Sequence, residues 1–163
     1  MSIYPEELVS KLDLLFKVEK EISEIIRSHG LRFSINKITG DLGEFYAFQK
    51  LKERKDIFDD IVQNKNSNAA YDFMGILNNS SSLFNDFGKK EIKIEVKTRR
   101  NQEGTKYLSS LKPEKFDLLC LVDIAENYGL NKVYLIKSET ANKQLDNRYN
   151  RLIFKEDMAF MTL

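Results

Sequence analysis

A short run of alternating charged and apolar residues carries the side chains best suited to chemistry. The run Glu91-Ile-Lys-Ile-Glu-Val-Lys-Thr-Arg99 has a period of two, which predicts a β-strand with one apolar and one charged face. Glu95 and Lys97 then lie on one face, about 6.6 Å apart along the strand. A carboxylate beside a lysine is half of a site for phosphodiester hydrolysis, which needs a divalent cation and a positive group near the nucleophile. A solvated hairpin edge is the alternative explanation of the charged row.

Asp72 is the candidate for the second acid of such a site. Mg²⁺ prefers a few carboxylate oxygens and completes its octahedron with water and substrate phosphate. Asp72 lies on the preceding predicted strand, residues 71–77. An antiparallel register would bring it opposite Glu95 or Lys97, whereas a slip of one residue would place it on the other face. The sequence leaves this register open. Two other Asp/Glu-x-Lys triplets are less suitable: Glu91-Ile-Lys93 lies nearer the loop, and Glu53-Arg-Lys55 lies on a predicted helix.

A third acid, Glu44, lies on a helix predicted from an N-cap at Thr39 to about residue 55. Its helical neighbours three, four and seven positions later are all apolar: Ala47, Phe48 and Leu51. A carboxylate on an apolar helix face is costly unless it meets a cation, a metal or a donor. Gly40 and Gly43 each cost the helix ~1 kcal/mol relative to alanine, which indicates a close approach of backbone or substrate. Alternatively, Glu44 pairs with a structural Lys or Arg, and the helix begins later.

The elements that must position these residues read as one α/β domain, residues 1–163. An amphipathic helix within residues 1–30 begins near Pro5 and ends at Gly30, with His29 as a helix-end residue. The later pattern predicts strands at residues 61–64, 71–77, 91–99, 116–124 and 132–137, a loop at 78–90 and a short helix within 109–115. Residues 138–163 form a basic C-terminal segment, helical at its start. A mixed central sheet flanked by helices is the expected architecture.

Composition excludes several classes of protein. The chain is 42% hydrophobic, with 11 Phe and 7 Tyr, which excludes intrinsic disorder. Its 26 Lys and Arg against 25 Asp and Glu give a net charge of +1, so nucleic-acid binding would need a local basic patch. The single Cys120 excludes a disulfide framework and a cysteine-rich zinc site. There is no signal peptide and no apolar run near the ~18 residues of a membrane span, so we expect a cytoplasmic protein with no membrane partner.

Taken together, Glu44, Asp72 and Glu95-Val-Lys97 resemble the active-site signature of the PD-(D/E)XK nuclease superfamily, the restriction-endonuclease-like fold. The resemblance spans residues 38–137. The segments Gly-Asp-Leu-Gly-Glu-Phe-Tyr-Ala-Phe and Ile-Glu-Val-Lys-Thr-Arg are also similar to those of small type II restriction-endonuclease-related domains. The resemblance to the superfamily implies an αβββαβ core, here with an extra N-terminal helix. Tyr71 stands where the family name has proline.

The resemblance also implies residue roles. Asp72 and Glu95 would ligate Mg²⁺, for which Mn²⁺ can substitute, with the Val96 carbonyl as a further ligand. Lys97 would orient the attacking water, and Glu44 would act through a water or a second metal. The implied function is that of a Mg²⁺-dependent endodeoxyribonuclease of restriction type. The alternatives are a non-catalytic module of this fold that binds DNA or a protein, and an α/β scaffold whose charged hairpin is incidental.

DNA, expected to be double-stranded, would be contacted by basic and amide side chains in two stretches. The candidates are Lys93, Arg99, Arg100, Asn101, Gln102, Lys106, Lys112, Arg148 and Arg151. One chain carries one candidate site, so cutting both strands requires two chains, most simply a homodimer. The first helix is the expected dimer interface, unless it packs on its own sheet.

Overall fold

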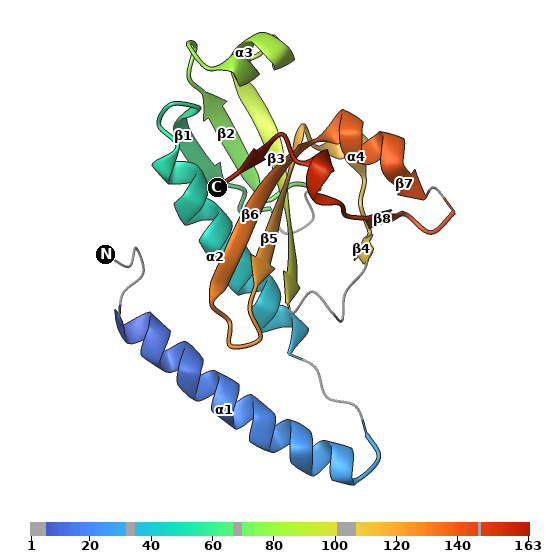
Figure 1. The fold of residues 1–163 in the computed structure, drawn as a ribbon. Helices are drawn as coiled ribbons and strands as arrows, with labels where there is room; N and C mark the ends of the chain where they lie inside the picture. The colour runs from blue at the N-terminus through green and yellow to red at the C-terminus, as the bar shows by residue number, and fades with distance from the viewer. Residues whose placement is uncertain (1–5, 32–34, 67–69, 101–106, 147) are drawn as a thin grey trace.

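A mixed central sheet organises the molecule (Figure 1). The computed structural model describes residues 6–31, 35–66, 70–100, 107–146 and 148–163. Within this part the sheet has the strand order β1-β2-β3-β5-β6-β9. The strands are β1 (Phe58–Gln63), β2 (Phe73–Leu77), β3 (Glu91–Arg100), β5 (Leu118–Ile124), β6 (Leu130–Lys137) and β9 (Met161–Thr162). Strands β3 and β5 are parallel, and the other neighbours are antiparallel. The prediction of a mixed α/β sheet is confirmed.

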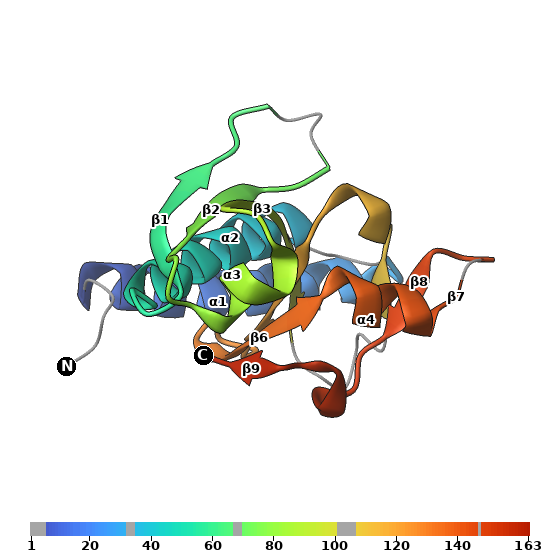
Figure 2. The ribbon, with the colours of Figure 1, turned by 90° about the horizontal axis from the view of Figure 1, so that it is seen from above.

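Each face of the sheet has its own apolar core. Helix α2 (Asn36–Glu53) buries Tyr46, Ala47 and Leu51 against one face, where Ile94 and Val96 of β3 are also buried. A small sheet of order β4-β8-β7 and helix α4 (Ser138–Gln144) cover the other face, as Figure 2 shows from above. The strands of the small sheet are β4 (Tyr107–Ser109), β7 (Leu145–Asp146) and β8 (Arg151–Ile153). Two-sided cover explains why every residue of β5 is buried.

The five predicted strands are present with shifted ends, but several connections differ from the expectation. The loop predicted at 78–90 contains helix α3 (Ser82–Phe87), capped by the Ser81 hydroxyl and ended by Gly88 at φ +62°. The helix expected within 109–115 is only a 3-10 turn, Pro113–Lys115. The C-terminal segment carries β7, β8 and β9 after α4. A regular helix between β3 and β5, as the αβββαβ order requires, is not present among the described residues.

Helix α2 begins earlier than predicted. Its first residue is Asn36, and the N-cap Ile35 supplies no side-chain cap. Thr39 is not the N-cap; it lies inside the helix, where its hydroxyl donates to the Ile35 carbonyl at 3.1 Å. The alternative that the helix begins after its glycines is therefore wrong, and Gly40 and Gly43 are helical.

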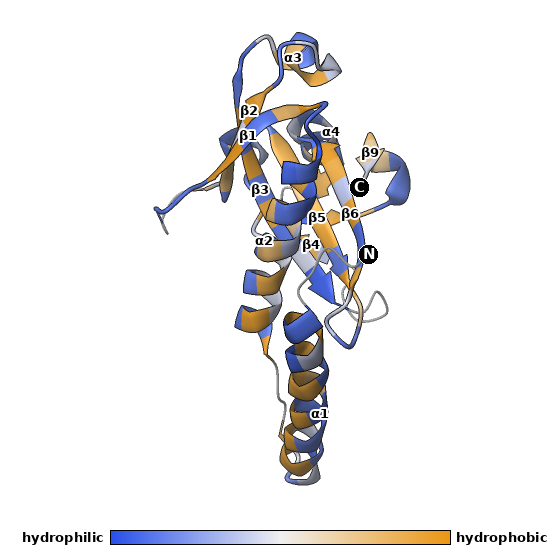
Figure 3. Cartoon of the chain, turned by 90° about the vertical axis from the view of Figure 1, so that its left-hand side faces the viewer, coloured by the Kyte–Doolittle hydropathy of each residue, from blue (hydrophilic) through white to orange (hydrophobic). Residues whose placement is uncertain are grey.

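Helix α1 (Glu6–Ser28) matches the predicted first helix and lies apart from the sheet in Figure 1. It ends at Gly30, whose φ of +74° lets the Leu31 N–H bond to the Ile26 carbonyl at 3.2 Å. No residue of α1 is fully buried, but Leu12, Leu15 and Phe16 are partly buried and pack against the core. Figure 3 shows hydrophobic residues along the exposed helix. Among the described residues, no helix combines the length and hydropathy needed to cross a membrane.

Candidate active site

The site is built where strands β2 and β3 part. The antiparallel ladder between them ends at Phe73 opposite Ile94, and the Asp72 N–H still donates to the Ile94 carbonyl at 2.9 Å. One position further, the Asp72 carboxylate takes the place of a backbone partner: its Oδ2 accepts the Val96 N–H at 2.7 Å. The register thus sets Asp72 opposite Glu95, one of the two arrangements that the sequence left open.

Glu95 and Lys97 lie side by side on β3, as the alternation predicts. The Lys97 Nζ is 2.8 Å from the Glu95 Oε1, and the two side chains are 27% and 14% exposed. Alternation also puts Val96 on the opposite face, against α2. The backbone N–H and C=O of one strand residue point to the same side, so the Val96 carbonyl faces the opening that holds Asp72.

Glu44 reaches the same site from α2, and a glycine makes its approach possible. A Cβ on Gly43 would lie 1.6 Å from the Thr98 Oγ1 of β3, so only glycine lets helix and strand pack at this distance. The close approach inferred from Gly43 is thus to a strand side chain. Nothing lies within 4 Å of a Cβ built on Gly40. Packing therefore does not explain why position 40 is a glycine.

The pKa shifts of the three acids have overlapping causes. Burial raises the pKa of Glu44, and the charges of Asp72, Asp41 and Glu95 raise it further. Burial also raises the pKa of Asp72, opposed by the Val96 N–H and by the charge of Lys97. The pKa of Glu95 is raised by burial and by Asp72, against the ion pair with Lys97. Half-buried carboxylates that repel one another are a place where a cation would be stabilising.

The donor set fits a sparsely ligated hard cation. No group of three or more His, Cys, Asp or Glu side chains among the described residues is arranged to hold a metal ion. Two carboxylates, Asp72 and Glu95, with the Val96 carbonyl beside them, are instead the kind of partial shell that Mg²⁺ accepts, since it keeps several waters. These three groups are the residues that would hold Mg²⁺.

Cavities surround Glu44, and one of them adds residues that the sequence reasoning missed. A cavity of about 510 Å³ lies between Glu44, Asp72 and the β1–β2 connection. Its remaining lining comes from Gln63, Asn64, Lys65, Asn66 and Tyr71. A second cavity, of about 620 Å³, opens from Glu44 and Lys97 towards the start of α2. In the sequence, the only indication of the first cavity is the amide-rich run Gln63-Asn-Lys-Asn66, which precedes Asp72.

Arg99, one of the expected DNA contacts, is engaged inside the protein. Asp123 is directly opposite on the parallel strand β5. The Arg99 Nη2 donates to the Asp123 Oδ2 at 2.7 Å, and the Arg99 Nε donates to the Asp123 Oδ1. The Arg99 side chain is 12% exposed and that of Asp123 only 1%. The ring of Phe154 covers the guanidinium group at 5.0 Å. We therefore assign Arg99 a structural role in place of the expected DNA contact.

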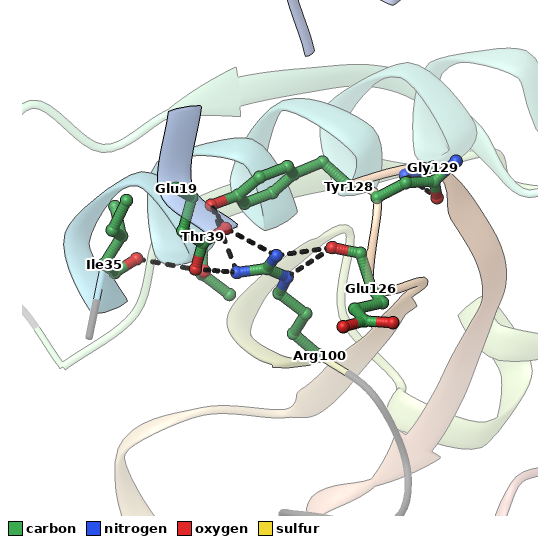
Figure 4. Close-up of polar contacts among 8 residues, drawn as sticks. Glu19, Ile35, Thr39, Arg100, Glu126, Tyr128 and Gly129 are labelled. Carbon is green, nitrogen blue, oxygen red and sulfur yellow. Dashed lines mark hydrogen bonds and ion pairs between the residues drawn. The ribbon is translucent and has the colours of Figure 1, made fainter. Parts of the chain in front are cut away.

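Arg100 is engaged as well, and it fastens α1 to the sheet (Figure 4). Its Nη1 and Nη2 donate to the Glu19 carboxylate at 2.7 and 2.6 Å, and its Nε donates to the Glu126 carbonyl at 2.9 Å. The guanidinium group stacks on the ring of Tyr128 at 3.9 Å, and the Tyr128 hydroxyl donates to Glu19 at 2.6 Å. Burial and the bond to Glu19 raise the pKa of Tyr128 to about 12. Because Glu19, Glu126 and Tyr128 already hold its guanidinium group, Arg100 does not support the predicted DNA contact.

The other expected DNA contacts divide into two groups. Lys93, Lys112, Arg148 and Arg151 are exposed, and Lys93 lies over the Tyr71 ring beside the site at 5.4 Å. Asn101, Gln102 and Lys106 lie outside the described residues. DNA binding by any of these residues remains a prediction.

Comparison with known proteins gives little support to any assignment. No protein-family model and no curated protein matches the chain. One solved structure with partial similarity is that of a bacterial homing endonuclease, I-Ssp6803I, at 12% sequence identity and a TM-score of 0.42. The alignment covers 65% of this chain and 71% of that one. This similarity is too low to carry an argument, so the resemblance to the PD-(D/E)XK superfamily stays a prediction and the site's own geometry must support a function.

Proposed function

We propose that this protein is a Mg²⁺-dependent endodeoxyribonuclease of restriction type, built on the PD-(D/E)XK arrangement. The observation that carries the proposal is the meeting of Asp72, Glu95 and Lys97 where β2 and β3 part, with Asp72 held by the Val96 N–H at 2.7 Å. The element order α2-β1-β2-β3 followed by parallel β5 supports the same arrangement.

Each residue has a distinct role in the proposed reaction. Asp72, Glu95 and the Val96 carbonyl would hold the cation, which when bound would polarise the scissile phosphate and lower the pKa of water. Lys97 donates a hydrogen bond to the attacking water and places a positive charge near the phosphate. Its ion pair with Glu95 keeps the ammonium group beside the carboxylates in the absence of substrate. Glu44 positions a second water through its carboxylate.

The test is cleavage of supercoiled plasmid and phage DNA with Mg²⁺, with Mn²⁺ and with EDTA. We expect cleavage with either metal, none with EDTA, and none from Asp72→Asn. Asp59→Asn is the matched control, because Asp59 is an exposed strand carboxylate that pairs only with Lys90, at 3.4 Å, among the described residues. Intact DNA throughout, from folded protein, would contradict the proposal and favour a non-catalytic module.

Cleavage of a duplex would need two chains, and we propose α1 as the contact between them. Its residues Leu14, Val18, Ile22 and Ile25 recur at steps of three and four and are 38–62% exposed. Glu19, which lies outside this stripe, is bound to Arg100. Val18→Glu should convert a dimer to a monomer in light scattering, whereas Lys17→Glu, outside this stripe, should not. A monomeric parent protein would contradict this arrangement.

A further inference from the structure

Two tyrosines and two arginines of the small sheet and of its β7–β8 turn form an exposed cluster, called the stack below, that the proposed active site does not use. The Arg151 guanidinium group lies over the Tyr107 ring at 5.6 Å and over the Tyr149 ring at 5.3 Å. The Arg148 guanidinium group also lies over the Tyr149 ring, at 5.2 Å. Arg151 thus lies near both rings, and Arg148 lies near Tyr149. Two aromatic rings and two guanidinium groups therefore lie close together on the surface.

Strands β4 and β8 carry two members of the stack, Tyr107 and Arg151. Strands β4 and β8 pair antiparallel, with Ser109 opposite Arg151. Leu108 and Leu152, the middle residues of the two strands, are 4% and 0% exposed and anchor both strands in the core. Their neighbours therefore point outward, because side chains alternate along a strand. Tyr107 and Tyr149 are left 48% and 53% exposed.

The charges of the stack are available to a ligand. In the described part of the chain, neither Arg148 nor Arg151 forms an ion pair with a carboxylate. Asp146 is opposite Arg151 across the β7–β8 ladder, but its carboxylate accepts the backbone N–H of Arg148 at 2.9 Å. Arg99 and Arg100, which are bound to acids, show the contrasting case.

We propose that this stack binds unpaired nucleobases of single-stranded nucleic acid. Bases stack on aromatic rings and on guanidinium planes whatever their sequence, and arginine adds attraction to the phosphates. In a duplex the faces of the bases are covered by their neighbours, so a stacking surface selects unpaired segments. The surface rests on residues other than Asp72, Glu95 and Lys97, so it binds with or without catalysis.

The experiment is fluorescence anisotropy in EDTA with labelled oligothymidylate, compared with a labelled duplex of the same length. We expect Tyr149→Ala to weaken single-strand binding about 5- to 160-fold, the range that loss of one base-stacking partner gives. Tyr149→Phe should retain binding. Arg151→Lys keeps the positive charge but removes the planar guanidinium group. It should therefore weaken binding of the single strand more than binding of the duplex. Phe160→Ala is the matched control, because Phe160 is another exposed ring under a cation, Lys137, at 5.6 Å.

Three results would overturn the proposal. The first is equal affinity of the parent protein for single strand and duplex, which would mean phosphate contacts alone. The second is an unchanged single-strand affinity in Tyr149→Ala. The third is no binding of either nucleic acid, which would leave the stack to a protein partner. Quenching of 2-aminopurine in the oligonucleotide, lost in Tyr149→Leu, provides a readout of stacking itself, and circular dichroism verifies that each variant is folded.

Discussion

The backbone N–H of Val96 donates a hydrogen bond of 2.7 Å to the carboxylate of Asp72. In a continuing β2–β3 ladder, this N–H of β3 would bond to a backbone carbonyl of β2. Here it bonds to a side chain instead. Because the strands part at this residue, the Asp72 carboxylate lies across from the Glu95–Lys97 pair of β3. The hydrogen bond also lowers the pKa of Asp72 against the effect of burial, so it favours the ionised form that a cation requires.

Removal of the Asp72 charge should abolish cation binding. A ligand that binds only the folded protein stabilises it by about 2.7 kcal/mol at one hundred times its dissociation constant. We therefore expect Mg²⁺ or Ca²⁺ to raise the melting temperature by about 5–10 °C at that concentration, since about 1 kcal/mol corresponds to 2–4 °C for a chain of this size. Asp72→Asn should lose this rise, and Asp59→Asn should keep it. The measurement is differential scanning fluorimetry with a metal titration, and an equal rise in both variants would count against the site.

The charge of Glu44 should cost stability at neutral pH. Its pKa is raised above the ordinary 4.5, mainly by burial and by Asp72, so the folded chain binds this proton more tightly than the unfolded chain does. The free energy of unfolding therefore falls as the pH rises from the ordinary pKa through the raised one. Glu44→Gln removes this fall. We expect the variant to melt above the wild type at neutral pH in EDTA, and the difference to vanish in acid below the ordinary pKa. Equal pH profiles would show that Glu44 is not in this environment.

The contact of Gly43 with Thr98 should be necessary for the placement of Glu44. Gly43→Ala sets a methyl group 1.6 Å from the Thr98 Oγ1 and must push α2 off β3. Overpacking of this kind costs about 1–3 kcal/mol, and we expect cleavage to fall with it. Gly40→Ala, where the space is open, should be neutral or stabilising. Urea unfolding of both variants measures the difference, which would be absent if the helix packed elsewhere.

Arg99 should act on stability and not directly on DNA. Arg99→Met removes the ion pair with the carboxylate of Asp123, which is 1% exposed. Loss of one member of a buried ion pair costs about 3–5 kcal/mol. We expect Arg99→Met to be strongly destabilised, and Arg99→Met with Asp123→Leu to recover much of the loss. A stable Arg99→Met with weakened DNA binding would restore the role that the sequence predicted for it.

The contrast between Lys97 and Arg99 shows how far the sequence can predict this site. The alternation of residues 91–99 placed both cations on one face of a strand, and the structure confirms that strand. Lys97 lies at the candidate site, whereas Arg99 is held in an ion pair with Asp123. Asp123 lies 24 positions after Arg99 and is opposite it only because β5 pairs in parallel with β3. Pairing partners far apart in sequence leave no local pattern.

The same limit explains the missed small sheet and the start of α2. Strands β4 and β8 have three residues each and pair across more than forty positions, too short for a visible period. Thr39 resembled an N-cap, yet its hydroxyl bonds within the helix to Ile35. The long helix α1 and strand β3, whose periods extend over many residues, were predicted closely because each carries its own signal.

The measurement that tests the central claim most directly is the single-turnover rate of DNA cleavage by Lys97→Met. We expect the rate to fall about 10²- to 10³-fold, the size of effect of one positioned donor near developing charge. DNA affinity in Ca²⁺ and the melting temperature should stay near those of the parent protein. Lys132→Met is the matched control, because Lys132 is also a strand lysine paired with a glutamate, Glu156, at 3.4 Å, and it should cut normally. Cleavage by Lys97→Met at the parental rate would contradict the account.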